Sequence, residues 1–157
     1  MSVSLGVEDP CQKDVADLIK QLTHALEVLT SPDACHHMSV EEMAQPDTTV
    51  FVARADGKAV GCGALKMHSD SVGEVKRLFC LPETQGKGIG RKILEEIVAL
   101  AEEKGLCSLV LETGWNYEAA IRLYESCGFE RCGPVLNYPE HPESVFYQKP
   151  LLALTEI

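Results

Sequence analysis

The feature of this sequence that most constrains the fold is the glycine-rich segment between residues 85 and 90. "QGKGIG" places three glycines within five positions, directly after an apolar run and directly before a helical pattern. Glycine is favoured where the backbone turns through left-handed conformations or must come close to a ligand. The segment therefore predicts a tight strand-to-helix junction whose open amides face an anion such as a phosphate group.

Two familiar phosphate motifs are absent from this segment. A dinucleotide fingerprint needs G-x-G-x-x-G after the first strand, whereas Gly86 and Gly88 are followed by Gly90 and then Arg91. The P-loop pattern G-x-x-x-x-G-K-[ST] does not occur. On these residues alone the alternative stays open that the segment is a tight turn with solvated basic side chains.

Length and composition predict an ordinary globular chain. It has 157 residues, for which we expect a single domain over 1–157, with 45% hydrophobic and 24% charged residues. No apolar run approaches the roughly 18 residues of a membrane-spanning helix, and the first ten residues lack the pattern of a signal peptide. The sequence therefore predicts a cytoplasmic protein with no membrane contact.

The charge distribution predicts the kind of partner. A net charge of −10 disfavours nucleic acid, because phosphate backbones attract basic faces. Three bases and no acid lie between Gln85 and Lys92, whereas five acids and no Lys or Arg lie between Glu27 and Asp47. An acidic chain with one basic segment suits a small anionic ligand better than a polyanion.

The seven cysteines favour neither a disulfide framework nor a metal site. They stand at positions 11, 35, 62, 80, 107, 127 and 132, an odd number without a CxxC pair. Most lie in apolar stretches, where cysteine behaves as a small hydrophobic residue. We expect all of them to be reduced, and we expect no zinc or other metal.

Apolar periodicity and turn residues predict an α+β or mixed α/β fold with a largely antiparallel sheet. Asp56-Gly57 is the strongest hairpin signal in the chain, and Ser39 and Glu42 have the spacing of a capping box. Strands are expected over 3–7, on both sides of the Asp56-Gly57 turn within 48–68, and over 74–81, 106–113 and 144–151. Helices are expected over 11–30, after Ser39, from the glycine segment to Gly105, and over 118–127.

Two long stretches carry a family resemblance. "GEVKRLFCLPETQGKGIGRKILEEIVALAEEKG" and "LVLETGWNYEAAIRLYESCGFE" resemble the GNAT superfamily of acetyl-CoA-dependent N-acetyltransferases. The resemblance covers nearly the whole chain in element order and is specific over residues 73–130. It implies a central, mostly antiparallel twisted sheet of six to seven strands flanked by about four helices.

The resemblance also implies how acetyl-CoA, the cosubstrate, is held. Backbone amides of residues 85–91 would bind the pyrophosphate, and the strand at residues 78–80 would splay from its neighbour to pair with pantetheine. The implied contact residues are Leu78, Phe79, Cys80, Gln85, Gly86, Lys87, Gly88, Ile89, Gly90, Arg91, Asn116, Tyr117 and Ala120.

One departure from the family pattern concerns the second motif. The family commonly has Asn-x-x-Ala before a Leu-Tyr pair. Alignment on Ala120, Leu123 and Tyr124 puts Tyr117 where that asparagine belongs, with Asn116 one residue early. The resemblance therefore still implies that the chain binds coenzyme A. It does not show which side chain of this motif makes the contact.

The resemblance implies two catalytic side chains. Tyr124 would lie near the thioester sulfur and act as general acid; the alternative is a core aromatic residue. Glu74 would deprotonate the amine, directly or through water; the alternative is a solvated carboxylate at a strand end. His36 and His37 fall where the family builds part of its acceptor site and are candidate bases. Cys80 has no histidine partner nearby in sequence and is expected to be structural.

The resulting hypothesis is direct transfer of an acetyl group from acetyl-CoA to a primary amine of a small molecule or peptide. The alternative is a catalytically silent acyl-CoA-binding regulatory module, and a homodimer is left open. Around the implied acceptor entrance the sequence supplies acids and no Lys or Arg: Asp33, Glu41, Glu42, Asp47, Glu140 and Glu143. This rim favours a cationic or neutral amine, whereas Arg77 and the two histidines could hold a carboxylate and would favour an amino acid.

Overall fold

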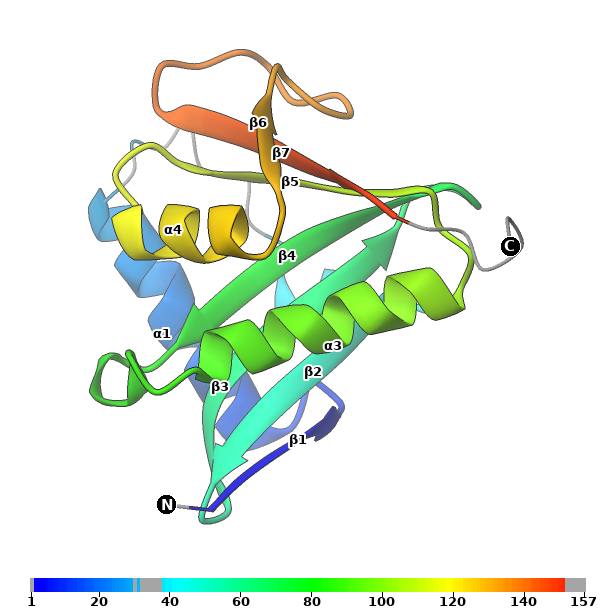
Figure 1. Ribbon diagram of the computed structural model, residues 1–157. Coiled ribbons are helices and arrows are strands. Elements are labelled where there is room, and N and C mark those ends of the chain that lie inside the picture. The colour runs from blue at the N-terminus through cyan, green and yellow to red at the C-terminus, as the bar shows by residue number, and fades with distance from the viewer. Residues whose placement is uncertain (1, 30, 32–37, 152–157) are drawn as a thin grey trace.

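The computed structural model describes residues 2–29, 31 and 38–151, and within them a single seven-stranded sheet is covered by four helices (Figure 1). The strand order is β1-β2-β3-β4-β5-β7-β6. The strands are β1 Val3–Val7, β2 Thr48–Ala55, β3 Lys58–Met67, β4 Val72–Cys80, β5 Ser108–Gly114, β6 Glu130–Cys132 and β7 Ser144–Pro150. The helices are α1 Lys13–Leu29, α2 Val40–Met43, α3 Ile89–Glu103 and α4 Glu118–Ser126. The expected α+β class with a mostly antiparallel sheet is confirmed.

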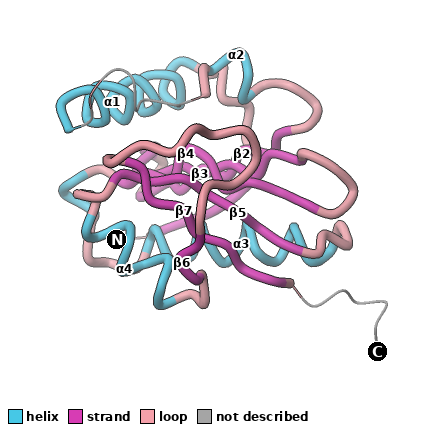
Figure 2. The backbone as a smooth tube through the Cα atoms, turned by 90° about the horizontal axis from the view of Figure 1, so that it is seen from above, coloured by secondary structure: helices cyan, strands magenta, loops and turns pink. Residues whose placement is uncertain are grey.

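The helices form two layers, one on each face of the sheet. Figure 2 shows α1 and α2 on one side of the strands and α3 and α4 on the other. Aliphatic side chains recur at helical spacing, so that α1 buries Leu18 and Leu22 and α3 buries Ile93 and Ile97. Burying such a side chain fully contributes about 1.5–3 kcal/mol, so the packing of these stripes holds the layers together.

Two local signals in the sequence are confirmed in detail. Asp56 and Gly57 have φ values of 50° and 87°, as a two-residue hairpin turn requires, and Ala55 pairs with Lys58 across it. Ser39 and Glu42 form both hydrogen bonds of a capping box at the start of α2. Short-range chemistry therefore fixes the β2–β3 hairpin and the entry to α2.

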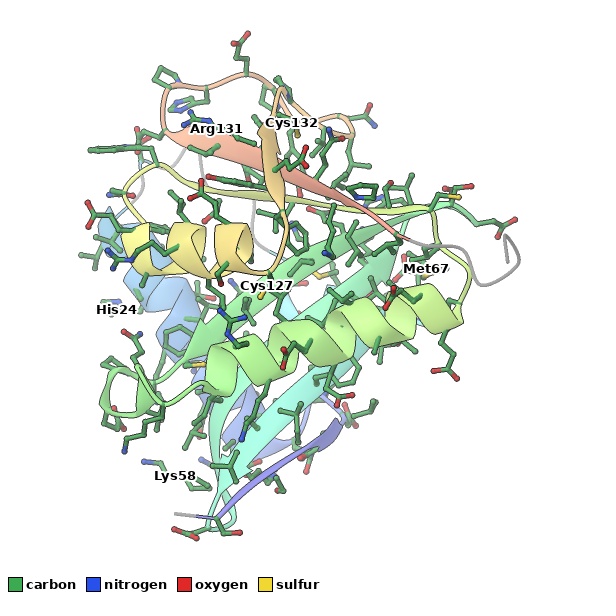
Figure 3. All side chains as sticks on the ribbon, in the orientation of Figure 1. His24, Lys58, Met67, Cys127, Arg131 and Cys132 are labelled. Carbon is green, nitrogen blue, oxygen red and sulfur yellow. The ribbon has the colours of Figure 1, made fainter. Side chains whose placement is uncertain are left out.

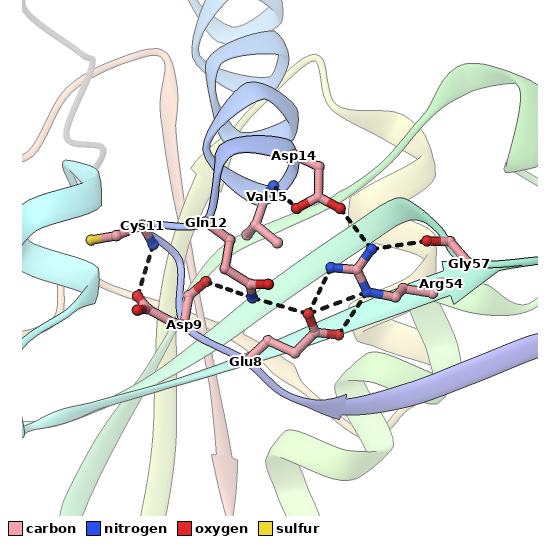
Figure 4. A network of polar contacts seen from close by, with 8 residues as sticks. All are labelled: Glu8, Asp9, Cys11, Gln12, Asp14, Val15, Arg54 and Gly57. Atoms are coloured by element: carbon pink, nitrogen blue, oxygen red, sulfur yellow. Dashed lines mark hydrogen bonds and ion pairs between the residues drawn. The ribbon is translucent and has the colours of Figure 1, made fainter.

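A polar cluster around Arg54 fastens the N-terminal elements to β2 (Figure 4). The Arg54 guanidinium contacts Glu8 at 2.7 Å and Asp14 at 2.7 Å, and it also donates to the carbonyl of Gly57 at 2.9 Å. The hydrogen bond from Arg54 holds the pKa of Glu8 below its usual value. This guanidinium thus has a partner on every side that faces the protein.

The pairing of β4 with β5 ends early, and this creates the central opening of the fold. The two strands are parallel and pair only at Val72 with Ser108, Gly73 with Leu109, and Glu74 with Val110. Beyond this point β4 continues to Cys80 and β5 to Gly114 without pairing to each other. Figure 1 shows the two strands diverging on the side where α4 lies.

A β-bulge lies in the divergent part of β4. Cys62 pairs with Phe79 and Ala64 with Lys76, so that Arg77 and Leu78 together oppose the single residue Gly63. Arg77 has a φ of 57°, a conformation uncommon for a residue with a side chain. The bulge changes the direction in which the following residues of β4 face.

The structure differs from the sequence prediction at the sheet edge, where the short strand β6 was not expected. It pairs antiparallel to β7 over three residues. None of the described helices is long and apolar enough to cross a membrane.

Candidate active site

A cleft of about 790 Å³ opens where β4 and β5 separate. Its walls come from α1 on one face of the sheet and from α3 and α4 on the other, with the glycine segment at one end. Because no strand fills the gap, the open edge of β4 from Val75 onward faces the cleft. The backbone there can pair with an extended ligand as it would with a strand.

The glycine segment adopts the conformation that its sequence predicts. Gly86 and Gly88 have φ values of 81° and 80°, and Gly88 caps α3 without a side chain. Within the described part of the chain, the N–H groups of residues 86–91 donate no hydrogen bond. A Cβ atom at Gly88 would meet nothing within 4 Å, and Gly86, Gly88 and Gly90 all line the cleft. A helix start with free amides favours a bound anion.

Nearly all of the predicted cofactor contacts are brought together by the fold. Residues that line the cleft are Leu78, Phe79, Cys80, Gln85, Gly86, Gly88, Ile89, Gly90, Arg91, Asn116, Tyr117 and Ala120. Lys87 is the exception, because it is exposed and lies outside the lining. Lys87 is therefore not part of the cleft wall.

Arg91 has a structural role in addition to its place in the lining. Its guanidinium donates to Ser126 Oγ at 2.6 Å and to Cys127 Sγ at 3.5 Å. Figure 3 shows Cys127 at the end of α4, on the side that faces α3. Arg91 therefore joins the start of α3 to the end of α4 across the cleft mouth.

Cys80 is a thiol rather than a thiolate. Burial raises its pKa to about 11, so the side chain stays neutral at physiological pH. This agrees with the expected structural role. The six described cysteines, at 11, 62, 80, 107, 127 and 132, form no disulfide with one another, and no group of three potential metal ligands occurs among the described residues.

Tyr124 lies at the inner end of the cleft. The side chain is only 6% exposed and packs against the rings of Phe129 and Tyr147, with centroids 5.8 and 6.4 Å away. Burial raises the pKa of the phenol, so the proton is retained at neutral pH. The hydroxyl makes no hydrogen bond to any described residue. Tyr124 is thus packed as a core aromatic residue and also belongs to the lining of the cleft.

Asn116 and Tyr117, which lie where the sequence departs from the family pattern, both make contacts within the protein. Asn116 donates through Nδ2 to the carbonyl of Leu29 at 3.2 Å, so it holds the end of α1. Tyr117 is the N-cap of α4, and its ring lies 3.1 Å from where a Cβ of Gly114 would stand. Both side chains line the cleft, but the amide of Asn116 is already engaged by the protein.

Glu74 has different surroundings from those expected of it. It is 2% exposed and accepts from Tyr138 at 2.6 Å, while His68 Nε2 lies 2.7 Å and Lys76 Nζ 3.5 Å from its oxygens. The alternative of a solvated carboxylate at a strand end is therefore wrong. Glu74 lines a second cavity of about 510 Å³, and Lys76 lines both cavities.

Two acidic side chains that face the large cleft have partners the sequence did not indicate. Glu112 on β5 accepts from Ser144 Oγ at 2.8 Å, and Glu143 accepts from Ser31 Oγ at 2.6 Å. Glu112 is not among the residues predicted for the site, although a lone carboxylate within the apolar run of β5 is a usable signal. Glu143 was predicted only as part of an acidic rim.

Other parts of the predicted acceptor site are only partly placed. His36, His37 and Asp33 lie outside the described residues. Glu41, Glu42 and Asp47 are exposed near α2, and Glu42 is engaged by the capping box.

A split parallel pair of strands in front of a glycine-capped helix is the architecture of an acetyltransferase that takes its acetyl group from acetyl-CoA. Comparison with known proteins agrees. The family described as "Acetyltransferase (GNAT) domain" matches residues 46–131. A protein named IAA acetyltransferase from Azospirillum brasilense is 39% identical over 151 residues, which is 96% of this chain and 99% of the relative.

Two solved structures extend the comparison to the fold. A putative acyl-CoA N-acyltransferase from Klebsiella pneumoniae superposes with a TM-score of 0.81 at 29% identity, over 96% of this chain and 98% of the other. A GNAT family acetyltransferase from Elizabethkingia anophelis, solved with acetyl-CoA bound, has a TM-score of 0.70 at 18% identity, over 95% of this chain and 98% of the other. The present chain belongs to the GNAT acetyltransferase family, and it is an N-acetyltransferase.

Proposed function

We propose that the cleft binds acetyl-CoA with its pyrophosphate on the amides of residues 86–91. The observation that carries this proposal is the end of β4–β5 pairing after Glu74, directly in front of the open amides of α3. The free edge of β4 offers backbone groups to the pantetheine amides. No metal is needed for this mode of binding.

The chemistry proposed is direct attack of an amine on the thioester. The amine nitrogen forms a bond to the carbonyl carbon, the carbon–sulfur bond breaks, and the leaving thiolate takes a proton. Tyr124 is proposed as the donor of that proton, because burial keeps its phenol protonated and its hydroxyl is not bound to another described side chain.

Two carboxylates are candidates for the base that takes the proton of the amine. Glu112 has direct access, since it lines the large cleft and Ser144 orients it. Glu74 is buried and engaged by Tyr138 and His68, so it would act only through a relay that ends at Lys76, the side chain that lines both cavities.

The acceptor proposed is the primary amine of a small molecule or a peptide. The related proteins support acetyl transfer and give no support to a silent acyl-CoA-binding module. Purified protein should release free thiol from acetyl-CoA over a panel of amines. Binding of acetyl-CoA by calorimetry without thiol release for any amine in a broad panel would contradict this mechanism.

Several predictions rest on the sequence alone. They are that residues 1–157 form a single domain, that the protein is cytoplasmic, and that it contacts neither nucleic acid nor membrane. Gel filtration coupled to light scattering would measure whether the chain forms the homodimer that the sequence leaves open.

A further inference from the structure

Arg77 is a buried cation that has no carboxylate partner among the described residues. The residue is 8% exposed and lines the large cleft on the side of α1. Its Nη2 donates to Thr23 Oγ1 at 2.5 Å. Its Nε and Nη1 are buried and have no hydrogen-bond partner, and no described acidic side chain lies within ion-pair distance of the guanidinium.

Arg54 shows how the same chain treats a guanidinium whose role is structural. Arg54 is only half-buried whereas Arg77 is buried, yet Arg54 contacts two carboxylates and a backbone carbonyl. Arg77 is more deeply buried and has a single neutral partner. Among the described residues, the guanidinium of Arg54 therefore has charged hydrogen-bond partners, whereas two of the three nitrogens of the Arg77 guanidinium have none.

A buried guanidinium that lacks partners is costly, because its donors are removed from water without replacement. Burial lowers the pKa of Arg77, yet arginine starts so high that the charge is kept at neutral pH. Thr23 cannot supply a counter-charge, since it is neutral and its own hydroxyl donates to the carbonyl of Ile19. A planar fork with free donors matches a carboxylate in geometry as well as charge.

The backbone of β4 explains how Arg77 reaches this position. The bulge opposite Gly63 puts Arg77 at a φ of 57°, and its side chain extends to Thr23 on α1. The guanidinium therefore lies on the face covered by α1, away from the free amides that precede α3. That separation assigns Arg77 to a ligand group other than the pyrophosphate.

We propose that Arg77 binds a carboxylate of the acceptor, so that the acceptor is an amino acid or another amine carrying a carboxylate. The inference rests on the proposed function, since it names the acceptor class of the same cleft. A carboxylate that enters the cleft accepts from one edge of the fork, and the guanidinium turns toward it. Glu112 and Glu143 line the same cleft and complement the cationic amine of a zwitterion.

The test is a comparison of matched acceptors with wild-type protein. Several L-amino acids and their C-terminal amides are compared by kcat/KM for thiol release from acetyl-CoA. The acids should be preferred on the order of 10²-fold, as expected when charged hydrogen bonds to a buried fork are lost. Equal kcat/KM for acids and amides, or preference for the amides and for polyamines, would overturn the inference while leaving the acetyl transfer intact.

Two variants and a control link the preference to Arg77. Arg77→Gln should abolish the discrimination between acid and amide, and Arg77→Lys should keep only part of it because the fork geometry is lost. Lys20→Gln, which removes an exposed charge of α1, should keep the full preference. A preference that persists in folded Arg77→Gln protein would also overturn the inference.

Acetyl-CoA affinity by calorimetry separates this inference from the proposed function. Arg77→Gln protein should bind acetyl-CoA as the wild type does, because the guanidinium lies away from the amides of the glycine segment. Wild-type protein that fails to bind acetyl-CoA would contradict the proposed function itself. If Arg77→Gln does not fold, the acid-to-amide ratio of the wild type alone decides the matter.

Discussion

The phenol of Tyr138 donates a 2.6 Å hydrogen bond to Glu74, a residue 64 positions earlier in the chain. Tyr138 belongs to the loop between β6 and β7, and Glu74 to the last residue pair that joins β4 to β5. Lys76 Nζ in turn donates to the Tyr138 hydroxyl at 2.7 Å. The three side chains connect this loop to the point where β4 and β5 stop pairing.

Tyr138→Phe should lower the free energy of unfolding. The change leaves a buried carboxylate without one of its donors, which costs about 1–3 kcal/mol. Urea unfolding followed by circular dichroism measures the loss. Tyr147→Phe is the matched control, because the Tyr147 phenol bonds the exposed Glu125 and its loss should cost about 1 kcal/mol or less. Equal stability of both variants would contradict a structural role for the Tyr138 bond.

Gly88→Val should weaken acetyl-CoA binding far more than Lys87→Ala. Valine at a φ of 80° is strained, so the substitution should displace the backbone that presents these amides. We expect a loss of at least about tenfold for Gly88→Val, against about two- to threefold for the exposed Lys87 charge. Calorimetry gives both affinities, and thermal melting checks that each variant is folded. Similar affinities for wild type and Gly88→Val would rule out binding at these amides.

Tyr124→Phe should lower turnover while acetyl-CoA affinity stays nearly unchanged. A proton donor that is needed only in the transition state affects kcat selectively, and its loss costs roughly 10²-fold. Tyr147→Phe again serves as control, since Tyr147 packs against Tyr124 but does not line the cleft. If kcat is unchanged in Tyr124→Phe while the chemical step is shown to be rate-limiting, Tyr124 is a structural core residue and not the proton donor.

Glu112→Gln and Glu74→Gln should separate the two candidate bases. We expect Glu112→Gln to lower kcat by on the order of 10²-fold at unchanged stability. Glu74→Gln should mainly lower stability, because the amide cannot satisfy the donors of Tyr138 and His68 as the carboxylate does. The opposite result would identify Glu74 as the base acting through its relay.

Cys62→Ala should flatten the loss of stability at alkaline pH. Burial raises the pKa of the Cys62 thiol to about 12, against about 8.5 in an unfolded chain. The neutral thiol thus favours the folded state below the unfolded pKa, and this contribution is lost as pH rises toward the folded pKa. The slope is about 1.4 kcal/mol per pH unit for one such group. Urea unfolding between pH 8 and 10.5 measures it, with Cys107→Ala, at an exposed position, as control.

The elements that sequence predicts well are those fixed by neighbouring residues. Asp56 and Gly57 set the β2–β3 hairpin, and Ser39 and Glu42 set the start of α2, because the determining contacts span two or three residues. The conformation of the glycine segment could also be predicted, because glycine is the residue type that favours positive φ values. Most of the residues that the family resemblance implies as cofactor contacts also line the cleft.

The elements that sequence predicts poorly depend on contacts between distant segments. β6 has three residues, too few for a periodic pattern, and exists because β7 offers it an edge. The burial of Glu74 depends on Tyr138, which no local pattern connects to it. The bulge at Arg77 depends on how β4 pairs with β3. The sequence shows only a basic residue within a strand, so it could not predict that the guanidinium would be buried with two nitrogens lacking hydrogen-bond partners.

The short parallel pairing of β4 with β5 has a consequence for the sheet as a whole. Three residue pairs are the entire hydrogen-bonded seam between a half-sheet of β1 to β4 and a half-sheet of β5, β7 and β6. In the proposed mode of binding, a pantetheine chain along β4 would lengthen that seam and supply the strand that the polypeptide omits. The donor would then be an architectural part of the enzyme, and the cohesion of the two halves would rise with the cellular concentration of acetyl-CoA through mass action.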